Sequence, residues 1–169
     1  MHQFTSFLEP TFNTRKISNN ISKISKSKLH TIKLVNDYVN KNIRYRRDIK
    51  GYGKVEFFAS PDRTLKNGWG DCEDLSSLEI AILNGVTKNR PDKVQWAFGY
   101  RSTFFGEPIS YHSWVEVNIK LHSKGDKRKL VSKWYIIETT NRKIYDKSKS
   151  TYVTLLIVHP THISIRRTF

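Results

Sequence analysis

The lone cysteine, Cys72, follows two closely spaced glycines and stands among acids in the sequence Gly70-Asp71-Cys72-Glu73-Asp74. Sulfur attacks a carbonyl carbon as the thiolate, and a helix N-terminus lowers a thiol pKa through free backbone N–H groups and the positive end of the helix dipole. Apolar residues recur at helical spacing after Cys72, which predicts that the thiol lies on the first turn of a helix. Cys72 is therefore a candidate nucleophile, with an inert core cysteine as the alternative.

Two further residues could complete a nucleophile site. His112 opens an alternating strand pattern, and Glu138 lies within a second, strongly apolar one. A neutral imidazole can accept the thiol proton and later protonate a leaving amine. A carboxylate beside the imidazole would fix its tautomer and stabilise the imidazolium. Each residue alone has an ordinary explanation: His112 could be a hydrogen-bonded strand histidine, and Glu138 could form a salt bridge at a strand end. Together with Cys72, however, the two residues predict a Cys–His–Glu site.

The surroundings of the thiol suggest how a substrate would bind. Glycine leaves space for a substrate backbone, and Trp114 shares a strand face with His112, so we expect Trp69, Gly70 and Trp114 to contact substrate. We expect the acids next to Cys72 to cap backbone amides rather than to face the sulfur, where they would raise its pKa. One cysteine with scattered histidines fits no common zinc spacing, so no metal and no cofactor are expected.

Helices precede strands along the chain. Ser27 is a suitable N-cap for a helix to about Ile43, and Asp71 caps the cysteine helix, which Gly85 ends. The segment 44–67 reads as loop with a short strand at 55–58, and a period of two begins after Pro91. The strands are expected at 94–102, 110–121, 133–140, 152–158 and 162–166. This order predicts an α+β fold in which the cysteine helix packs on an antiparallel β-sheet.

The 169 residues suit one domain. We expect residues 28–169 to form it, with residues 1–27 as a polar N-terminal arm or strap, or a short amphipathic helix carrying Ile17, Ile21 and Ile24. A single cysteine allows no internal disulfide. No apolar run is long enough to span a bilayer, and the N-terminus lacks the apolar region of a signal peptide. A cytoplasmic location is therefore expected, with release by lysis or packaging in a particle left open.

The formal net charge of +15 is concentrated in the two ends of the chain. Residues 1–60 hold 12 Lys and Arg against 4 Asp and Glu, and residues 121–169 hold 11 against 3. The middle segment, 61–120, is close to neutral with 7 against 8. Such a basic chain is attracted to polyanions, nucleic acid or an anionic cell-wall polymer. The alternative is simply a well-solvated surface.

Three motifs in order carry a resemblance to a known family: Gly-Asp-Cys-Glu-Asp at 70–74, His-Ser-Trp-Val-Glu-Val at 112–117 and Trp-Tyr-Ile-Ile-Glu-Thr-Thr at 134–140. Over about residues 28–142 the chain resembles the transglutaminase-like superfamily of cysteine enzymes, which share a papain-like α+β core. The resemblance implies Cys72 as nucleophile, His112 as general base and Glu138 as orienting acid. The family more often has aspartate in the third position, so Glu138 is a departure.

The resemblance implies an enzyme that acts on amide bonds of a protein or peptide through an acyl-enzyme. The peptidase, isopeptidase or amidase reaction is favoured over transamidation, because small domains of this superfamily resemble proteases and no acid cluster for calcium is evident. The backbone N–H of Cys72 would stabilise the oxyanion with a second donor, for which Trp69 is a weak candidate. The alternative is a catalytically silent module that binds a polyanion or has a structural role in an assembly. The oligomeric state is left open.

Overall fold

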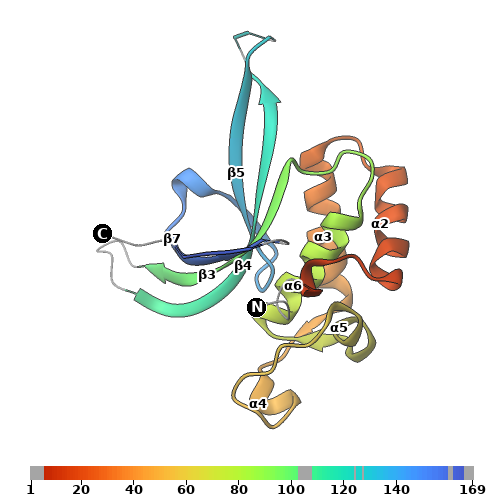
Figure 1. The fold of residues 1–169 in the computed structure, drawn as a ribbon, viewed down its shortest axis with the longest axis vertical. Helices are drawn as coiled ribbons and strands as arrows, with labels where there is room; N and C mark the ends of the chain where they lie inside the picture. The colour runs from red at the N-terminus through yellow and green to blue at the C-terminus, as the bar shows by residue number, and fades with distance from the viewer. Residues whose placement is uncertain (1–5, 103–107, 124, 127, 160–161, 166–169) are drawn as a thin grey trace.

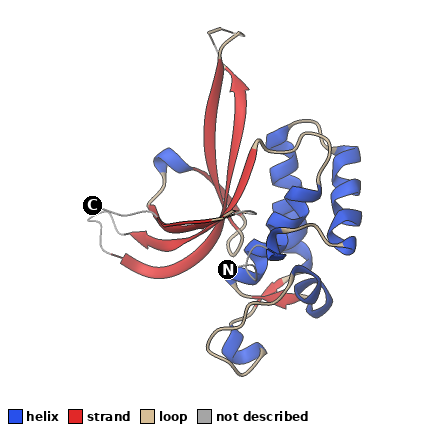
Figure 2. Ribbon diagram, viewed as in Figure 1, coloured by secondary structure: helices blue, strands red, loops and turns tan. Residues whose placement is uncertain are grey.

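The computed structural model describes residues 6–102, 108–123, 125–126, 128–159 and 162–165. A group of helices lies beside one six-stranded antiparallel sheet, and helix α6 (Cys72–Gly85) lies between the sheet and the other helices (Figures 1 and 2). The expected α+β architecture, with the cysteine helix packed on an antiparallel sheet, is confirmed. Among the described residues, no helix has both the length and the apolar character needed to cross a bilayer.

The helical layer forms from the first half of the chain, and one of its helices begins at the expected N-cap, Ser27. The Thr11 and Thr14 side chains form a capping box at the start of α2, and the Ser27 hydroxyl accepts the His30 N–H at the start of α3. The elements are η1 (Ser6–Leu8), α2 (Phe12–Ile24), α3 (Lys28–Asn42), α4 (Asp48–Gly51), α5 (Pro61–Asn67) and α6.

The sheet has the strand order β6-β5-β4-β3-β7-β8, and each neighbouring pair is antiparallel. The strands are β3 (Lys93–Ser102), β4 (Pro108–His122), β5 (Leu130–Glu138), β6 (Lys143–Asp146), β7 (Tyr152–Val158) and β8 (Ile163–Ile165). A short 3₁₀ helix, η2 (Lys147–Lys149), connects β6 to β7. A separate parallel pair joins β1 (Arg44–Tyr45) to β2 (Trp69–Gly70), directly before the cysteine.

Strands β4 and β5 continue beyond the rest of the sheet as a two-stranded hairpin. The last pair between β3 and β4 is Lys93 with Asn118, whereas β4 and β5 stay paired out to His122 and Leu130. This hairpin projects from the body of the molecule (Figure 1). Its described residues Lys120, Leu121 and Leu130 are exposed, because nothing in the described chain covers the extension.

Helix α6 is buried on all sides, since the sheet covers one face and α2, α3 and α5 cover the others. Every residue from Glu73 to Leu83 is buried. The expected apolar face of Leu75, Leu78 and Ile82 belongs to the main core, with Val115 and Val117 of β4 opposite. Burying such side chains contributes roughly 1.5–3 kcal/mol each. The element that carries the cysteine is thus anchored along its whole length.

The structure differs from the sequence prediction in the segment 44–67, and it adds detail to the prediction for the N-terminal segment. The segment 44–67 contains α4 and α5, and residues 55–58 form no strand. The expected loop was wrong because Pro61 stands on the first turn of α5, where proline favours a helix, with Ser60 as its N-cap. Near the N-terminus, α2 contacts α6, and the Ser18 hydroxyl lies 2.7 Å from the Ile82 carbonyl oxygen. The division of the chain at residue 27 stays a prediction.

Candidate active site

Cys72 is the first residue of α6, as the sequence predicts. Asp71 occupies the N-cap position, and its carbonyl accepts the Leu75 N–H at 3.0 Å. The backbone N–H of Cys72 therefore precedes the hydrogen-bonded turns of the helix and is free for another acceptor. The Cys72 side chain is partly buried and lines a small cleft.

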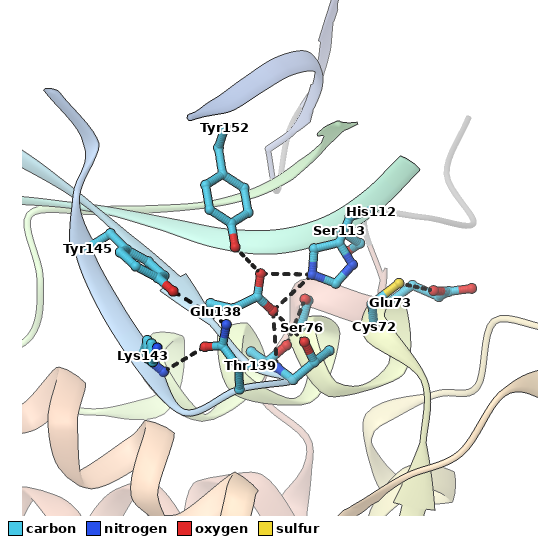
Figure 3. Close-up of polar contacts among 12 residues, drawn as sticks. Cys72, Glu73, Ser76, His112, Ser113, Glu138, Thr139, Lys143, Tyr145 and Tyr152 are labelled. Atoms are coloured by element: carbon cyan, nitrogen blue, oxygen red, sulfur yellow. Dashed lines mark hydrogen bonds and ion pairs between the residues drawn. The ribbon is translucent and has the colours of Figure 1, made fainter. Parts of the chain in front are cut away.

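His112 of β4 and Glu138 at the end of β5 contact each other directly. The His112 Nε2 atom lies 2.8 Å from Glu138 Oε1 and 2.9 Å from Oε2. Because the carboxylate holds Nε2, the other ring nitrogen, Nδ1, is left for the cleft. The ring of His112 lies between Glu138 and Cys72 (Figure 3). The fold thus brings residues from three separated segments to one place.

Glu138 is almost fully buried and receives several hydrogen bonds. The Tyr152 hydroxyl donates to Oε2 at 2.6 Å, and the Thr140 hydroxyl and N–H donate to Oε1 at 2.7 and 3.1 Å. Burial alone would raise the pKa of Glu138. The hydrogen bond and the charge of His112 oppose this effect, and so do the hydrogen bonds from Tyr152 and Thr140. Together they outweigh burial and hold the pKa of Glu138 below its usual value. Glu138 is therefore an ionised partner for an imidazolium.

The cleft has a volume of about 210 Å³, and Cys72 and His112 both line it. Gly99 of β3 pairs with His112 across the ladder and also lines the cleft. A Cβ at position 99 would collide with the Val153 carbonyl oxygen, so glycine is required there. The remaining lining residues are aromatic, acidic or small: Phe58, Phe98, Tyr111, Glu56, Glu73 and Ser113.

The thiol itself faces an acid. Cys72 Sγ donates a hydrogen bond to Glu73 Oε2 at 3.0 Å. Burial, followed by the charge of Glu73, raises the pKa of Cys72. The expectation that the neighbouring acids cap amides was wrong for two of them. Asp71 makes no side-chain capping bond, and Glu73 turns toward the sulfur.

Carboxylates gather on the other side of Glu73. Asp48 of α4 lies beside Asp71 and Asp74, with one oxygen of each within 4.8 Å of the others. Asp48 Oδ1, Asp71 Oδ1 and Asp74 Oδ2 are buried and make no hydrogen bond. Gly70 is needed here, because a Cβ at that position would lie 2.6 Å from Asp74 Cβ. Glu56 and Glu73 form a second group with Asp48.

Ionised carboxylates are costly to bury, and the pKa values of these acids reflect this cost. Burial, with the charge of Asp71, raises the pKa of Asp48 to about 6. Burial also raises the pKa of Asp74 to about 7 and that of Glu73 to about 9. Carboxylate oxygens are the ligand type that a hard divalent cation such as calcium takes. Sequence analysis found no acid cluster, because Asp48 and Glu56 are distant from the cysteine motif along the chain.

The three predicted substrate-binding residues lie outside the residues that line the cleft. Trp69 packs on Tyr52 with ring centroids 4.6 Å apart and belongs to a different surface pocket. Gly70 is buried against Asp74. Trp114 is fully buried and donates from Nε1 to Glu116 at 3.2 Å. A direct contact of these residues with substrate stays a prediction.

Sequence reasoning missed Tyr152, Thr140 and the aromatic wall of the cleft. Tyr152 reaches Glu138 from β7, a pairing that depends on strand order rather than on sequence spacing. Thr140 could have been predicted as a hydrogen-bond donor to Glu138, because its hydroxyl is only two residues further along the chain. Phe58 and Phe98 come from an irregular segment and from β3, and periodicity alone does not bring them together.

Comparison with known proteins gives a family and a fold. The sequence model of the transglutaminase-like superfamily core matches residues 15–138. No curated protein matches the chain. LapG of Legionella pneumophila in a calcium-bound form is 16% identical, with a TM-score of 0.61, and the match covers 89% of this chain and 76% of LapG. An EGTA-treated form of LapG gives 16% identity and a TM-score of 0.62, covering 94% and 80%.

A protein of Cytophaga hutchinsonii named as a candidate cysteine protease is also similar. It shares 16% identity with a TM-score of 0.58, and the match covers 90% of this chain but only 46% of that protein. Matches at identities this low show that the fold is shared, and they do not show that the substrate is shared.

Proposed function

Because the chain belongs to the transglutaminase-like superfamily, we propose that it is a cysteine hydrolase of amide bonds in proteins or peptides. The observation that carries the proposal is that His112, which is hydrogen-bonded to Glu138, lines the same cleft as Cys72. The similarity to a candidate cysteine protease supports hydrolysis rather than cross-linking. Glu138 takes the place of the more usual aspartate.

The reaction balances with these three side chains. The Cys72 proton passes to Nδ1 of His112, and Sγ bonds to the substrate carbonyl carbon. The Cys72 N–H can stabilise the oxyanion that forms. The carbon–nitrogen bond then breaks as the imidazolium protonates the leaving amine, which leaves a thioester on Sγ. Water attacks the thioester, with His112 taking its proton and returning a proton to sulfur. Glu138 stabilises the imidazolium in both halves.

The acid cluster supports a second element of the proposal, a regulatory divalent cation. LapG is described in a calcium-bound form, and the three unpaired oxygens of Asp48, Asp71 and Asp74 fit a hard cation. These residues would hold it, with Glu56 and Glu73 within reach. A bound cation supplies positive charge that offsets the acids around the thiol.

Covalent labelling tests the nucleophile. Wild-type protein and the variants Cys72→Ala and His112→Gln are treated with a peptidyl vinyl sulfone, in calcium and in EGTA, and the adduct is located by mass spectrometry. We expect an adduct on Cys72 of the wild type and slower labelling of His112→Gln. Equal labelling of Cys72→Ala, or no wild-type labelling beyond that of free cysteine in either condition, would contradict the proposal.

A polyanion-binding function is the second candidate, and the projecting hairpin favours it. Lys120, Arg128 and Lys129 are all exposed on the hairpin, and a two-stranded ribbon fits the DNA major groove. The expected result is that the logarithm of affinity for duplex DNA falls linearly with the logarithm of salt concentration. The double variant Lys120→Glu, Lys129→Glu should flatten this slope. An affinity that does not depend on salt concentration would contradict DNA binding through these basic side chains.

A further inference from the structure

We propose that Tyr152 is a positioning residue for the catalytic pair, because its hydroxyl fixes the carboxylate of Glu138 against His112. The inference rests on the proposed hydrolase function and adds a residue that the three family motifs do not include. Tyr152 comes from β7, the strand on the far side of β3 from β4. Its side chain therefore reaches the catalytic pair across the sheet face (Figure 3).

The Tyr152 hydroxyl has a short contact with the catalytic acid. It donates to Glu138 Oε2 at 2.6 Å, the oxygen that lies 2.9 Å from His112 Nε2. Thr140 donates to the other oxygen, Oε1, at 2.7 Å. The carboxylate is thus held at both oxygens, so its plane cannot turn away from the imidazole without breaking a charge-assisted hydrogen bond.

Packing holds the Tyr152 ring in this place. The Trp114 ring meets it edge-on with centroids 5.1 Å apart, and the Tyr145 ring lies 5.8 Å away. Trp114 is itself fixed, because its Nε1 donates to the buried carboxylate of Glu116. Glu116 forms an ion pair with Lys147 and accepts from Gln95 at 2.6 Å. Trp114 therefore contributes by supporting the tyrosine.

Removing only the hydroxyl would leave a buried carboxylate oxygen without its second donor. Since donors stabilise the ionised form, the pKa of Glu138 would rise, and the acid would be protonated at a higher pH. A protonated Glu138 no longer stabilises the imidazolium. The titratable and charged groups around the pair are His112 of β4, Tyr145 of β6, the buried Glu79 of α6 and Arg101 of β3. None of them replaces the lost donor.

The test compares Tyr152→Phe with Tyr145→Phe. Tyr145 is the matched control, because its hydroxyl accepts from Asn141 at 3.4 Å and makes no hydrogen bond with Glu138 among the described residues. The probe is iodoacetamide, with the alkylation rate of Cys72 measured against pH in the presence of calcium. A second readout is the carbon-13 NMR titration of the Glu138 carboxyl group.

For Tyr152→Phe we expect alkylation about tenfold slower at neutral pH, the cost of one charge-assisted hydrogen bond. We also expect the acidic limb of the rate profile and the Glu138 titration to move to higher pH. Tyr145→Phe should leave both unchanged. A merely structural role for Tyr152 would lower thermal stability without moving the Glu138 titration.

The outcomes separate the two proposals. A wild-type thiol no more reactive than free cysteine would contradict the hydrolase function itself. A reactive wild type, with Tyr152→Phe and Tyr145→Phe giving the same rate profile and the same Glu138 titration, would overturn the role of Tyr152 alone. If Tyr152→Phe does not fold, 3-fluorotyrosine at position 152 keeps the ring and strengthens the donor. It should then move the Glu138 titration to lower pH, and no movement would overturn the proposal.

Discussion

The thiol of Cys72 donates a 3.0 Å hydrogen bond to the carboxylate of Glu73, the next residue on α6. A helix N-terminus lowers the pKa of a thiol, and this contact has the opposite effect. A carboxylate that accepts a hydrogen bond from the S–H group stabilises the thiol over the thiolate. The structure therefore favours the thiol form of the proposed nucleophile. Drawing the Glu73 carboxylate toward Asp48 would free the thiol from this hydrogen bond.

Replacing Glu73 by Gln should make the thiol more reactive. The variant loses the negative charge that raises the pKa of Cys72, and each unit of decrease raises the thiolate fraction about tenfold. Because the pKa of Glu73 is raised to about 9, this acid carries its charge only at high pH. Iodoacetamide alkylation at about pH 10 in EGTA should therefore be at least about tenfold faster than in wild type. Glu9→Gln, an exposed acid far from the cleft in sequence, is the control. An unchanged rate in Glu73→Gln would mean that burial alone controls the thiol.

Calcium-free protein should lose stability as pH rises from about 4 toward 9. Burial raises the pKa of Asp48 to about 6, Asp74 to about 7 and Glu73 to about 9. A group with a raised folded-state pKa contributes stability below its unfolded pKa, and this contribution is lost as pH passes through the folded value. Thermal melts in EGTA should thus give a higher Tm near pH 5 than near pH 8. A Tm that rises over this interval would contradict the assignment.

Calcium should stabilise the wild type and not Asp48→Asn. Ligand at one hundred times its Kd contributes ~2.7 kcal/mol, which corresponds to roughly 5–10 °C in the Tm of a chain of this size. Asp48→Asn removes the charge from one of the three carboxylates that have an unpaired oxygen and should lose most of this shift. Differential scanning fluorimetry and calorimetric titration measure it. Asp37→Asn, an exposed acid on α3, should keep the shift, and its loss there would argue for a general salt effect.

Breaking the Lys147–Glu116 ion pair should destabilise the sheet. Glu116 is fully buried, and Lys147 neutralises it together with donors from Thr154 and Gln95. Lys147→Met leaves an unpaired buried charge, which costs roughly 3–5 kcal/mol. Urea unfolding measures the change, with the exposed Lys143→Met as control. Equal stability of the two variants would show that Glu116 is satisfied by its neutral donors alone.

The helix and strands that carry the three candidate residues could be predicted from the sequence because each has a local signal. Cys72 on the first turn of α6 follows from the apolar spacing after it and from Gly85 at its end. His112 and Glu138 follow from strand alternation, since a charged residue in an apolar strand requires a partner. These signals depend on neighbours within a few residues, so they can be detected without knowing the fold.

The acid cluster and Tyr152 could not be predicted in the same way. Asp48 and Asp74 meet because β1 pairs in parallel with β2, a contact between segments more than twenty residues apart. Tyr152 meets Glu138 because β7 pairs with β3 rather than with β6. Of the acids around Cys72, Asp74 accepts the Ala59 N–H at 2.7 Å, whereas Glu73 accepts from the sulfur. Such choices depend on tertiary packing.

Helix α2 has a practical consequence for protein engineering. The Ser18 hydroxyl meets the Ile82 carbonyl oxygen, and Asn84 donates to the Leu8 carbonyl oxygen at 2.9 Å. A shortened recombinant form starting after residue 24 would expose the trailing end of the cysteine helix to solvent and strip these polar partners away. Affinity tags are therefore better fused ahead of Ser6, and crystallisation trials are better begun with this leading helix intact.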